Sequence, residues 1–453
     1  MLATYSSMTY GAQLKRRMLA RAIFCSTVGA AIEFFDFALF GLVVVAIGAA
    51  FFPSHDPLAS TLSAFVTFGA GFLARPVGAV VFGHVGDRIG RKATLIVTLL
   101  GTGTATFLMG LVPTYAQIGI WGPIFITVLR LAQGLSLGGE WAGSVLLTVE
   151  WGDRDRRGLL GALPQIGIPL GVALGSSSAL ISSTLVHDPY WSWRLPFLAS
   201  IVLVSVGLYL RLGVLETPVF AQLLEERRTE RHPVQEVLRR QWRDVVVISL
   251  MRAGEQTPTL LVTSFGIVYS QLVLKMPFTM ALHYSLFYLL LSAALIPILG
   301  RVSDVVGRKW LYLTGAAGMA LWALPFWRLL DTREPSLILL AYTGAALTWT
   351  AMAGPLAALF AETFTGRMRY SGSSIGYQLA ALTAGGPTLI VATYLLGRFH
   401  SGTAIGLYML ASAVVSFVFT LVMRDRSRQD LSVEYDEDRP DPRPRAVPFP
   451  LKY

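Results

Sequence analysis

The stretch Gly83-His-Val-Gly-Asp87-Arg88-Ile-Gly90-Arg91-Lys92 returns later in the chain as Gly300-Arg-Val-Ser-Asp304-Val-Val-Gly307-Arg308-Lys309. Both copies follow the pattern G-x-x-x-D-x-x-G-R-K, and each comes directly after a long apolar run. A second motif is duplicated with them: Glu150 with Arg157, and Glu362 with Arg369, each spaced E-x6-R. Motifs repeated in the same order predict a protein of two equivalent halves, as in transporters whose halves rock about a central site.

The residue types in these turns suit a gate. Glycine permits a tight turn and a close approach of helices, and an aspartate beside arginine and lysine can hold two bundles together until the gate opens. We therefore assign a gating role to both copies and to the two E-x6-R pairs. The alternative is ordinary positive charge at a cytoplasmic turn.

The composition excludes most classes of soluble protein. Hydrophobic residues make up 54% of the 453 residues and charged residues only 14%, against about 45–50% and about 25% in soluble domains. The mean hydropathy is +0.58. A single cysteine, Cys25, excludes a disulfide framework or a cysteine-built metal site, so we expect no metal and no cofactor. The net charge of +10 is spread in short clusters between apolar runs, which disfavours nucleic acid as a partner.

The apolar runs predict membrane-spanning helices, because a helix of about 20 residues crosses the hydrocarbon core with its backbone satisfied. The expected fold class is an all-α membrane protein of twelve spans in two six-helix bundles. We expect the spans at residues 22–50, 58–82, 93–112, 120–149, 158–184, 194–212, 244–273, 279–300, 309–329, 336–360, 371–396 and 402–423.

Lysine and arginine give the expected orientation, because they favour cytoplasmic loops. Most of them fall in the loops of one side, whereas the other side carries Lys275, Arg328, Arg333 and Arg398. We therefore predict a multi-pass protein of the inner (plasma) membrane with both ends in the cytoplasm. The expected parts are a cytoplasmic N-terminus (1–21), two bundles (22–212 and 244–423), a cytoplasmic linker (213–243) and a disordered cytoplasmic tail (424–453).

The chain resembles the major facilitator superfamily, and within it the metabolite:proton symporters, which include α-ketoglutarate, citrate, shikimate and proline/betaine carriers. The supporting segments are Ile32-Glu-Phe-Phe-Asp36-Phe37, Ala74-Arg-Pro-Val-Gly78, Arg130-Leu-Ala-Gln-Gly134, Trp193-Arg-Leu-Pro-Phe197 and Glu216-Thr-Pro-Val-Phe220, besides the repeated turns. The resemblance implies two bundles that expose a central site alternately to each side. The sequence departs from the family pattern in its first span, where the family usually has Trp and Tyr at the positions of Phe34 and Phe35. Its tail also lacks the coiled coil of the proline/betaine branch.

Glu33 and Asp36 in the first span are candidates for proton coupling. Their i,i+3 spacing places both on one helical face, and two close carboxylates at low dielectric favour the protonated form of at least one. We predict Asp36 as the proton acceptor with Glu33 assisting. The alternative is a static ion pair with Arg130 or Arg75. Arg130 offers a planar fork that either binds a substrate carboxylate or pairs with Asp36, and the resemblance, which ties the matching arginine to proton coupling, favours the second role.

Further ionisable and amide groups inside the spans are candidates for substrate binding, because such groups are costly in the membrane, at about 2.5–3.5 kcal/mol each on insertion scales. Arg252 and Glu255 open the seventh span, where we expect Pro258 to break the helix. The alternative for Arg252 is to reach the cytoplasmic headgroups. With Arg130, the candidate substrate-binding residues are Arg252, Glu255, Gln133, Gln165, Tyr377 and Gln378.

These observations predict a monomeric, proton-coupled secondary transporter, not an enzyme, that imports a small organic acid or a related zwitterion by alternating access. Its expected partners are the substrate, protons and the lipid bilayer. No P-loop occurs in the sequence. The alternatives are a proton-coupled exporter of the same fold, and a polytopic sensor or enzyme.

Overall fold

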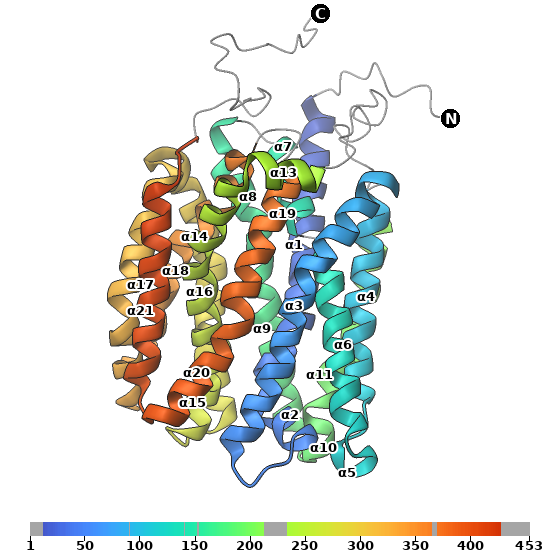
Figure 1. Ribbon diagram of the computed structural model, residues 1–453, viewed down its shortest axis with the longest axis vertical. Helices are drawn as coiled ribbons and strands as arrows, with labels where there is room; N and C mark the ends of the chain where they lie inside the picture. The colour runs from blue at the N-terminus through green and yellow to red at the C-terminus, as the bar shows by residue number, and fades with distance from the viewer. Residues whose placement is uncertain are drawn as a thin grey trace, which may run out of the picture.

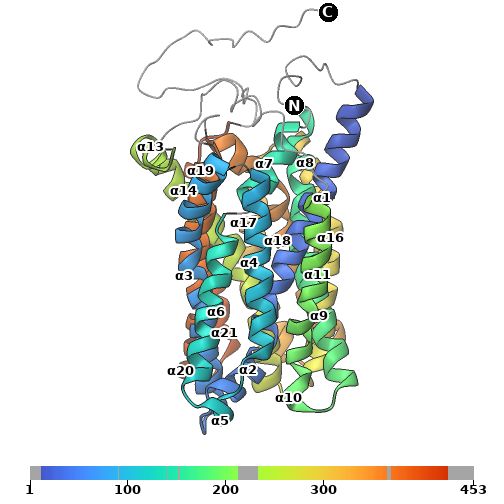
Figure 2. The ribbon, with the colours of Figure 1, turned by 90° about the vertical axis from the view of Figure 1, so that its right-hand side faces the viewer.

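The computed structural model of the protein describes residues 12–89, 91–139, 141–151, 154–212, 233–364 and 369–426. These residues are almost entirely helical, and no strand lies among them. The long helices run side by side along the long axis of the molecule (Figures 1 and 2). Helix α1 begins and helix α21 ends at the same end of the molecule (Figure 1), as an even number of spans requires. We call this the charged end, and the opposite one the short-loop end.

Six spans form the N-terminal bundle: α1 (Ala12–Leu42) with α2 (Val44–Phe51), α3 (Pro57–Ile89), α4 (Arg91–Leu111), α6 (Trp121–Leu137) with α7 (Trp141–Trp151), α8 (Arg157–Gln165) with α9 (Gly167–Leu185), and α11 (Arg194–Leu212). Six more form the C-terminal bundle: α14 (Trp242–Leu260) with η2 (Leu261–Phe265) and α15 (Gly266–Leu272), α16 (Phe278–Val306), α17 (Arg308–Asp331), α18 (Pro335–Thr363), α19 (Arg369–Ala380) with η3 (Ala381–Gly385) and α20 (Gly386–Phe399), and α21 (Gly402–Val422). The predicted all-α fold of twelve spans is thereby confirmed.

Short elements join the spans. Helices α5 (Tyr115–Ile118) and α10 (Pro189–Ser192) lie at the short-loop end, whereas α13 (Pro233–Arg240) lies in a connection at the charged end (Figure 1). The short turn η1 (Arg154–Arg156) directly precedes α8. The Asp188 side chain accepts a hydrogen bond from the backbone N–H of Tyr190 and so caps α10. Residues 213–232 of the predicted linker and 427–453 of the predicted tail lie outside the described residues.

Length and hydropathy alone identify eight segments of the described chain that can cross a membrane: 19–42, 57–82, 157–185, 189–212, 278–306, 335–363, 369–399 and 402–422. The other four spans are α4, α6 with α7, α14 with α15, and α17. Helix α4 contains a shorter apolar stretch, Ile96–Leu111.

Contacts between the bundles position the site. Helices α8 and α9 pack against α16, α8 also packs against α18, and α3 packs against α20. These pairs bring the first-half and second-half helices together along the middle of the molecule (Figure 1). Residues that face across this seam come from both halves.

The seventh span differs from our expectation of a break at Pro258. Helix α14 continues through Pro258 to Leu260, and the irregular segment is the π-helical turn η2 that follows. Proline removes one backbone donor from the ladder, and here the register shifts only after the proline. The eleventh span carries a second π-helical turn, η3, between α19 and α20. π-Helical turns inside helices frequently mark functional sites.

Candidate functional site

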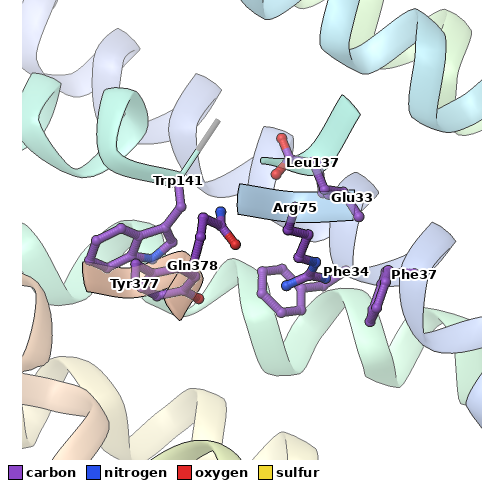
Figure 3. A pocket seen from close by; sticks show the side chains of 8 residues that line it. All are labelled: Glu33, Phe34, Phe37, Arg75, Leu137, Trp141, Tyr377 and Gln378. Atoms are coloured by element: carbon purple, nitrogen blue, oxygen red, sulfur yellow. The ribbon is translucent and has the colours of Figure 1, made fainter. Parts of the chain in front are cut away.

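A small cavity lies between the two bundles. The N-terminal bundle contributes most of its lining, and α19 of the C-terminal bundle contributes the rest (Figure 3). The lining residues are Glu33, Phe34, Phe37, Arg75, Leu137, Trp141, Tyr377 and Gln378. The cavity combines aromatic walls with charged and amide groups, which is the usual composition of a small-molecule site.

Glu33 and Asp36 lie on the buried face of α1, but their surroundings differ. Glu33 lines the cavity and pairs with Arg211 of α11, with 3.1 Å between Oε1 and Nη2. Asp36 is 0% exposed, and neither of its carboxylate oxygens has a hydrogen-bond partner among the described residues. The alternative of a static ion pair with Arg130 or Arg75 is therefore wrong for this structure.

Arg130 is held by groups other than the Asp36 carboxylate. Its Nη1 donates to the side chain of Gln133 and to the backbone carbonyl of Phe37, the latter at 3.4 Å. Its guanidinium also lies 4.4 Å from the ring centre of Phe37 and packs on further phenylalanines. Gln133 Nε2 donates to the backbone carbonyl of Asp36 at 3.1 Å and to the Thr106 hydroxyl at 2.7 Å. Arg130 and Gln133 thus contact the turn of α1 that carries Asp36, and neither lines the cavity.

A stack of three side chains crosses the seam at one wall of the cavity. The rings of Trp141 and Tyr377 are stacked, with 3.8 Å between their centres. The Arg252 guanidinium lies 3.5 Å from the ring centre of Tyr377 on the C-terminal side. Trp141 Nε1 donates to Gln165 Oε1 at 3.2 Å, so Gln165 supports the stack and does not line the cavity.

Arg252 is buried among protein groups. It is 3% exposed, and its Nε lies 3.6 Å from Glu255 Oε2. The alternative that Arg252 reaches lipid headgroups is therefore wrong. Glu255 Oε1 accepts a hydrogen bond from Trp349 Nε1 at 2.9 Å, so both groups form part of a network behind Tyr377.

This network repeats the one in the first half. The same number of positions separates Glu33 from Arg252, Asp36 from Glu255, and Arg130 from Trp349. Each half therefore carries an acidic residue on its first span and a hydrogen-bond donor on its fourth, at equivalent positions. In the second half the acidic residue is engaged with Trp349 and Arg252, whereas in the first half Asp36 has no such contact.

The second repeated turn joins the two bundles at the charged end. Asp304 at the end of α16 accepts hydrogen bonds from the backbone N–H groups of Gly158 and Leu159, at 2.7 and 3.1 Å. These are the first orphan donors of α8, where a carboxylate is favoured. Arg308 bridges Asp304 and Glu362, at 3.2 and 2.8 Å. We call Asp304, Arg308, Glu362 and the start of α8 the latch.

Other predicted gating residues lie around the latch. Gly307 has φ +103°, a conformation that favours glycine, between α16 and α17. Lys309 Nζ donates to the carbonyls of Leu421 and Met423 and so caps α21. Arg157 and Arg369 are buried at the same end. Predicted gating residues whose side chains fall outside the described part are Gly83, Asp87, Arg88, Gly90, Arg91, Lys92 and Glu150.

The bundles also touch beside the cavity and at the short-loop end. The Tyr370 hydroxyl donates to the carbonyl of Gly139 at 2.9 Å, and Gln378 Nε2 donates to that of Gly138 at 3.1 Å. Toward the short-loop end, the rings of Phe65 and Phe265 lie 6.4 Å apart. Contacts between the halves therefore occur at both ends of the cavity.

Several residues of the site are missing from the sequence-based candidates. Arg75 is expected from the sequence only as a possible ion-pair partner of Asp36, Arg211 lies at the edge of an apolar run, and the aromatic residues of the cavity resemble any others. Among the described residues, no cluster of His, Cys, Asp and Glu could hold a metal ion. The site offers binding, ion pairing and protonation rather than covalent chemistry.

Comparisons with known proteins agree with this architecture. The family described as "Sugar (and other) transporter" matches residues 22–246. The inner membrane metabolite transport protein YhjE of Escherichia coli is 34% identical over 424 residues, which cover 91% of this chain and 95% of that protein. The shikimate transporter of Escherichia coli is 35% identical over 419 residues, covering 90% and 95%. The proline/betaine transporter of the same bacterium is 31% identical over 436 residues, covering 91% and 85%.

The fold is also similar to that of a solved structure. The proton:xylose symporter XylE, described as bound to 6-bromo-6-deoxy-D-glucose, superposes with a TM-score of 0.71 and 15% identity. The match covers 90% of this chain and 96% of that one. At this identity the likeness concerns the fold alone.

Proposed function

The chain belongs to the major facilitator superfamily, among its metabolite transporters, and on this premise we propose that it imports a small organic acid or a related zwitterion together with protons. Transporters of this family are not enzymes. We place the protein in the inner membrane with both ends in the cytoplasm, so that the charged end is cytoplasmic. In this proposal residues 22–212 and 244–423 form the two moving bundles, joined by the cytoplasmic linker 213–243.

The observation that carries the proposal is the isolation of Asp36. A buried carboxylate is stable in its charged form only with a compensating partner, and Asp36 has none among the described residues. A neutral, protonated Asp36 side chain accounts for its burial without a partner in this structure. Proton loss would create a charge on the turn of α1 whose backbone Arg130 and Gln133 already contact.

Pairing of Asp36 with Arg130 then couples protonation to bundle movement. The Arg130 guanidinium would leave Gln133 for the carboxylate, because an ionised partner gives a stronger hydrogen bond than an amide. This exchange alters how α1 packs on α6. A proton is thereby taken up in one state of the carrier and released in another, as symport requires.

The latch supplies the second part of the cycle. Its contacts join the bundles at the charged end in this state, and they must break before the cavity opens to the cytoplasm. Asp304 then no longer accepts hydrogen bonds from the N-terminus of α8, while its ion pair with Arg308 within the C-terminal bundle remains. The latch therefore sets the free-energy difference between the two orientations.

Transport by purified protein in liposomes tests the proposal. We expect counterflow with at least one acid from a panel of shikimate, α-ketoglutarate, citrate and small monocarboxylates, with betaine as the zwitterion. An inward proton gradient should drive accumulation, and collapsing it should abolish accumulation. In intact cells, a fall in the substrate content when the proton gradient is collapsed supports import. A rise in the substrate content would support a proton-coupled exporter instead. Failure of every compound in counterflow would overturn the proposed substrate class.

A further inference from the structure

Arg75 is the cation among the described residues that line the cavity, and the carboxylate of the same lining, Glu33, is paired with Arg211. Arg75 is 5% exposed and lines the cavity from α3. Its guanidinium lies 4.0 Å from the ring centre of Phe37 and 4.6 Å from that of Phe72. No ion pair or hydrogen bond of Arg75 occurs within the described residues, and its Nε is a buried donor without an acceptor.

The other buried arginines near the cavity each have a polar partner, although Nε and Nη2 of Arg130 and Nε of Arg252 are also buried donors without an acceptor among the described residues. Arg211 pairs with Glu33, Arg252 lies beside Glu255, and Arg130 donates to Gln133 and to a backbone carbonyl. Arg130 and Arg252 also do not line the cavity. Of the arginines in the described part of the chain, Arg75 is therefore the one that presents its guanidinium to the cavity (Figure 3).

The charge balance around the cavity calls for an anion. Among the described residues, four buried arginines (75, 130, 211 and 252) face three buried carboxylates (Glu33, Asp36 and Glu255). Counted over these described residues, the excess is positive even when every group is ionised, and it grows when Asp36 carries a proton. Buried charge without compensation is costly, so a carboxylate beside Arg75 would stabilise the loaded state.

The remaining walls restrict the body of the ligand. Phe34, Phe37, Trp141 and Tyr377 provide flat apolar surface, which suits a ring or a short hydrocarbon chain. The neutral polar groups of the lining are Gln378 and Tyr377, and Gln378 Oε1 is a buried acceptor without a donor. This lining offers a carbohydrate few hydrogen-bond partners.

From these observations we propose that Arg75 binds the carboxylate of a small, compact monocarboxylate, whose body packs between the aromatic walls and donates a hydrogen bond to Gln378. The inference rests on the proposed function and names its substrate class and its anion-binding residue. A guanidinium suits this role because its fork matches the two oxygens of a carboxylate.

Matched acid and ester ligands test the proposal in the full-length protein. The probes are shikimate and methyl shikimate, with benzoate and methyl benzoate as a second pair. Each is measured as an inhibitor of counterflow of the acid that the wild type carries, without a proton gradient. We expect the wild type to prefer each acid over its ester by about 10- to 100-fold, the worth of a charge-assisted hydrogen bond. Arg75→Gln should reduce this preference to about 1, and Arg75→Lys should retain part of it.

Arg252→Gln is the matched control, because it removes a buried arginine that the cavity does not expose. It should keep the acid preference even where it lowers transport. If Arg75→Gln no longer folds, the preference of Arg75→Lys for each acid over its ester tests the proposal. A preference equal to that of the wild type overturns the proposal. An unchanged preference in Arg75→Gln overturns it as well and leaves the proposed function standing. A wild type that carries no acid overturns both.

Discussion

Asp36 and Arg130 lie on neighbouring helices, yet the guanidinium contacts the Gln133 side chain and the Phe37 carbonyl instead of the carboxylate. The sequence predicts both residues as charges in the membrane, because their position within apolar runs suffices for that. It does not predict that Gln133 joins Arg130 to the backbone of Asp36, since this depends on how α1, α4 and α6 pack. These contacts of Arg130 and Gln133 are therefore known only from the folded protein.

Asp36→Asn should abolish proton-driven accumulation of the transported acid while leaving counterflow within about twofold of the wild type. Asparagine keeps the shape of the protonated side chain but cannot release a proton. The two assays on the same liposomes separate coupling from binding. Accumulation at the level of the wild type would exclude Asp36 as the proton carrier.

Arg211→Gln should lower the stability of the protein by about 3–5 kcal/mol, because it leaves the Glu33 carboxylate buried without its cation. Thermal unfolding in detergent measures this, and the double variant Arg211→Gln, Glu33→Gln should be more stable than the single one. Arg240→Gln is the control, since Arg240 forms an exposed pair with Glu236 on α13, worth about 0–1 kcal/mol. Equal losses for Arg211→Gln and Arg240→Gln would contradict the importance of the buried pair.

The helical elements follow from the sequence more completely than the site does. The expected span at 194–212 coincides with α11, and that at 402–423 ends one residue beyond α21, because apolar length and flanking charge determine where a span ends. The interruptions are harder to predict. We expected Pro258 to break the seventh span, but the register shifts in η2 after it. Tyr377 and Gln378 are candidates from the sequence because they are polar residues within a span. Trp141 is not, because which face of a helix meets the cavity depends on its neighbours.

Gly158→Ala tests the latch at the level of packed helices. A Cβ at Gly158 would lie 2.3 Å from Ser303 Oγ and 2.6 Å from the Gly300 carbonyl, so α8 and α16 must separate. We expect a shift toward the state that is open at the charged end. Spin labels at Asp155 and Val305, in a Cys25→Ser background, should report a longer distance by double electron–electron resonance.

Gly143→Ala is the matched control for the latch, because its added Cβ would lie 3.5 Å from the Tyr370 ring, an ordinary contact. Its label distances should equal those of the unsubstituted protein. Unchanged distances in Gly158→Ala would contradict the latch as a determinant of the bundle orientation.

The whole molecule is a duplicated bundle whose charged end we place in the cytoplasm. Fusions to the C-terminus test this orientation, because green fluorescent protein matures in the cytoplasm and alkaline phosphatase is active outside it. We expect a fluorescent fusion and an inactive phosphatase. The reverse pattern would invert the expected topology and move the latch to the outer side.

Proton movement during substrate uptake tests the central claim most directly. Liposomes that contain the protein and an internal pH dye are given the transported acid from outside, with no proton gradient imposed and with the membrane potential clamped by potassium and valinomycin. Symport predicts that the interior acidifies with substrate entry in the wild type and not in Asp36→Asn. Entry of radiolabelled substrate into wild-type liposomes without a change of internal pH would contradict the account.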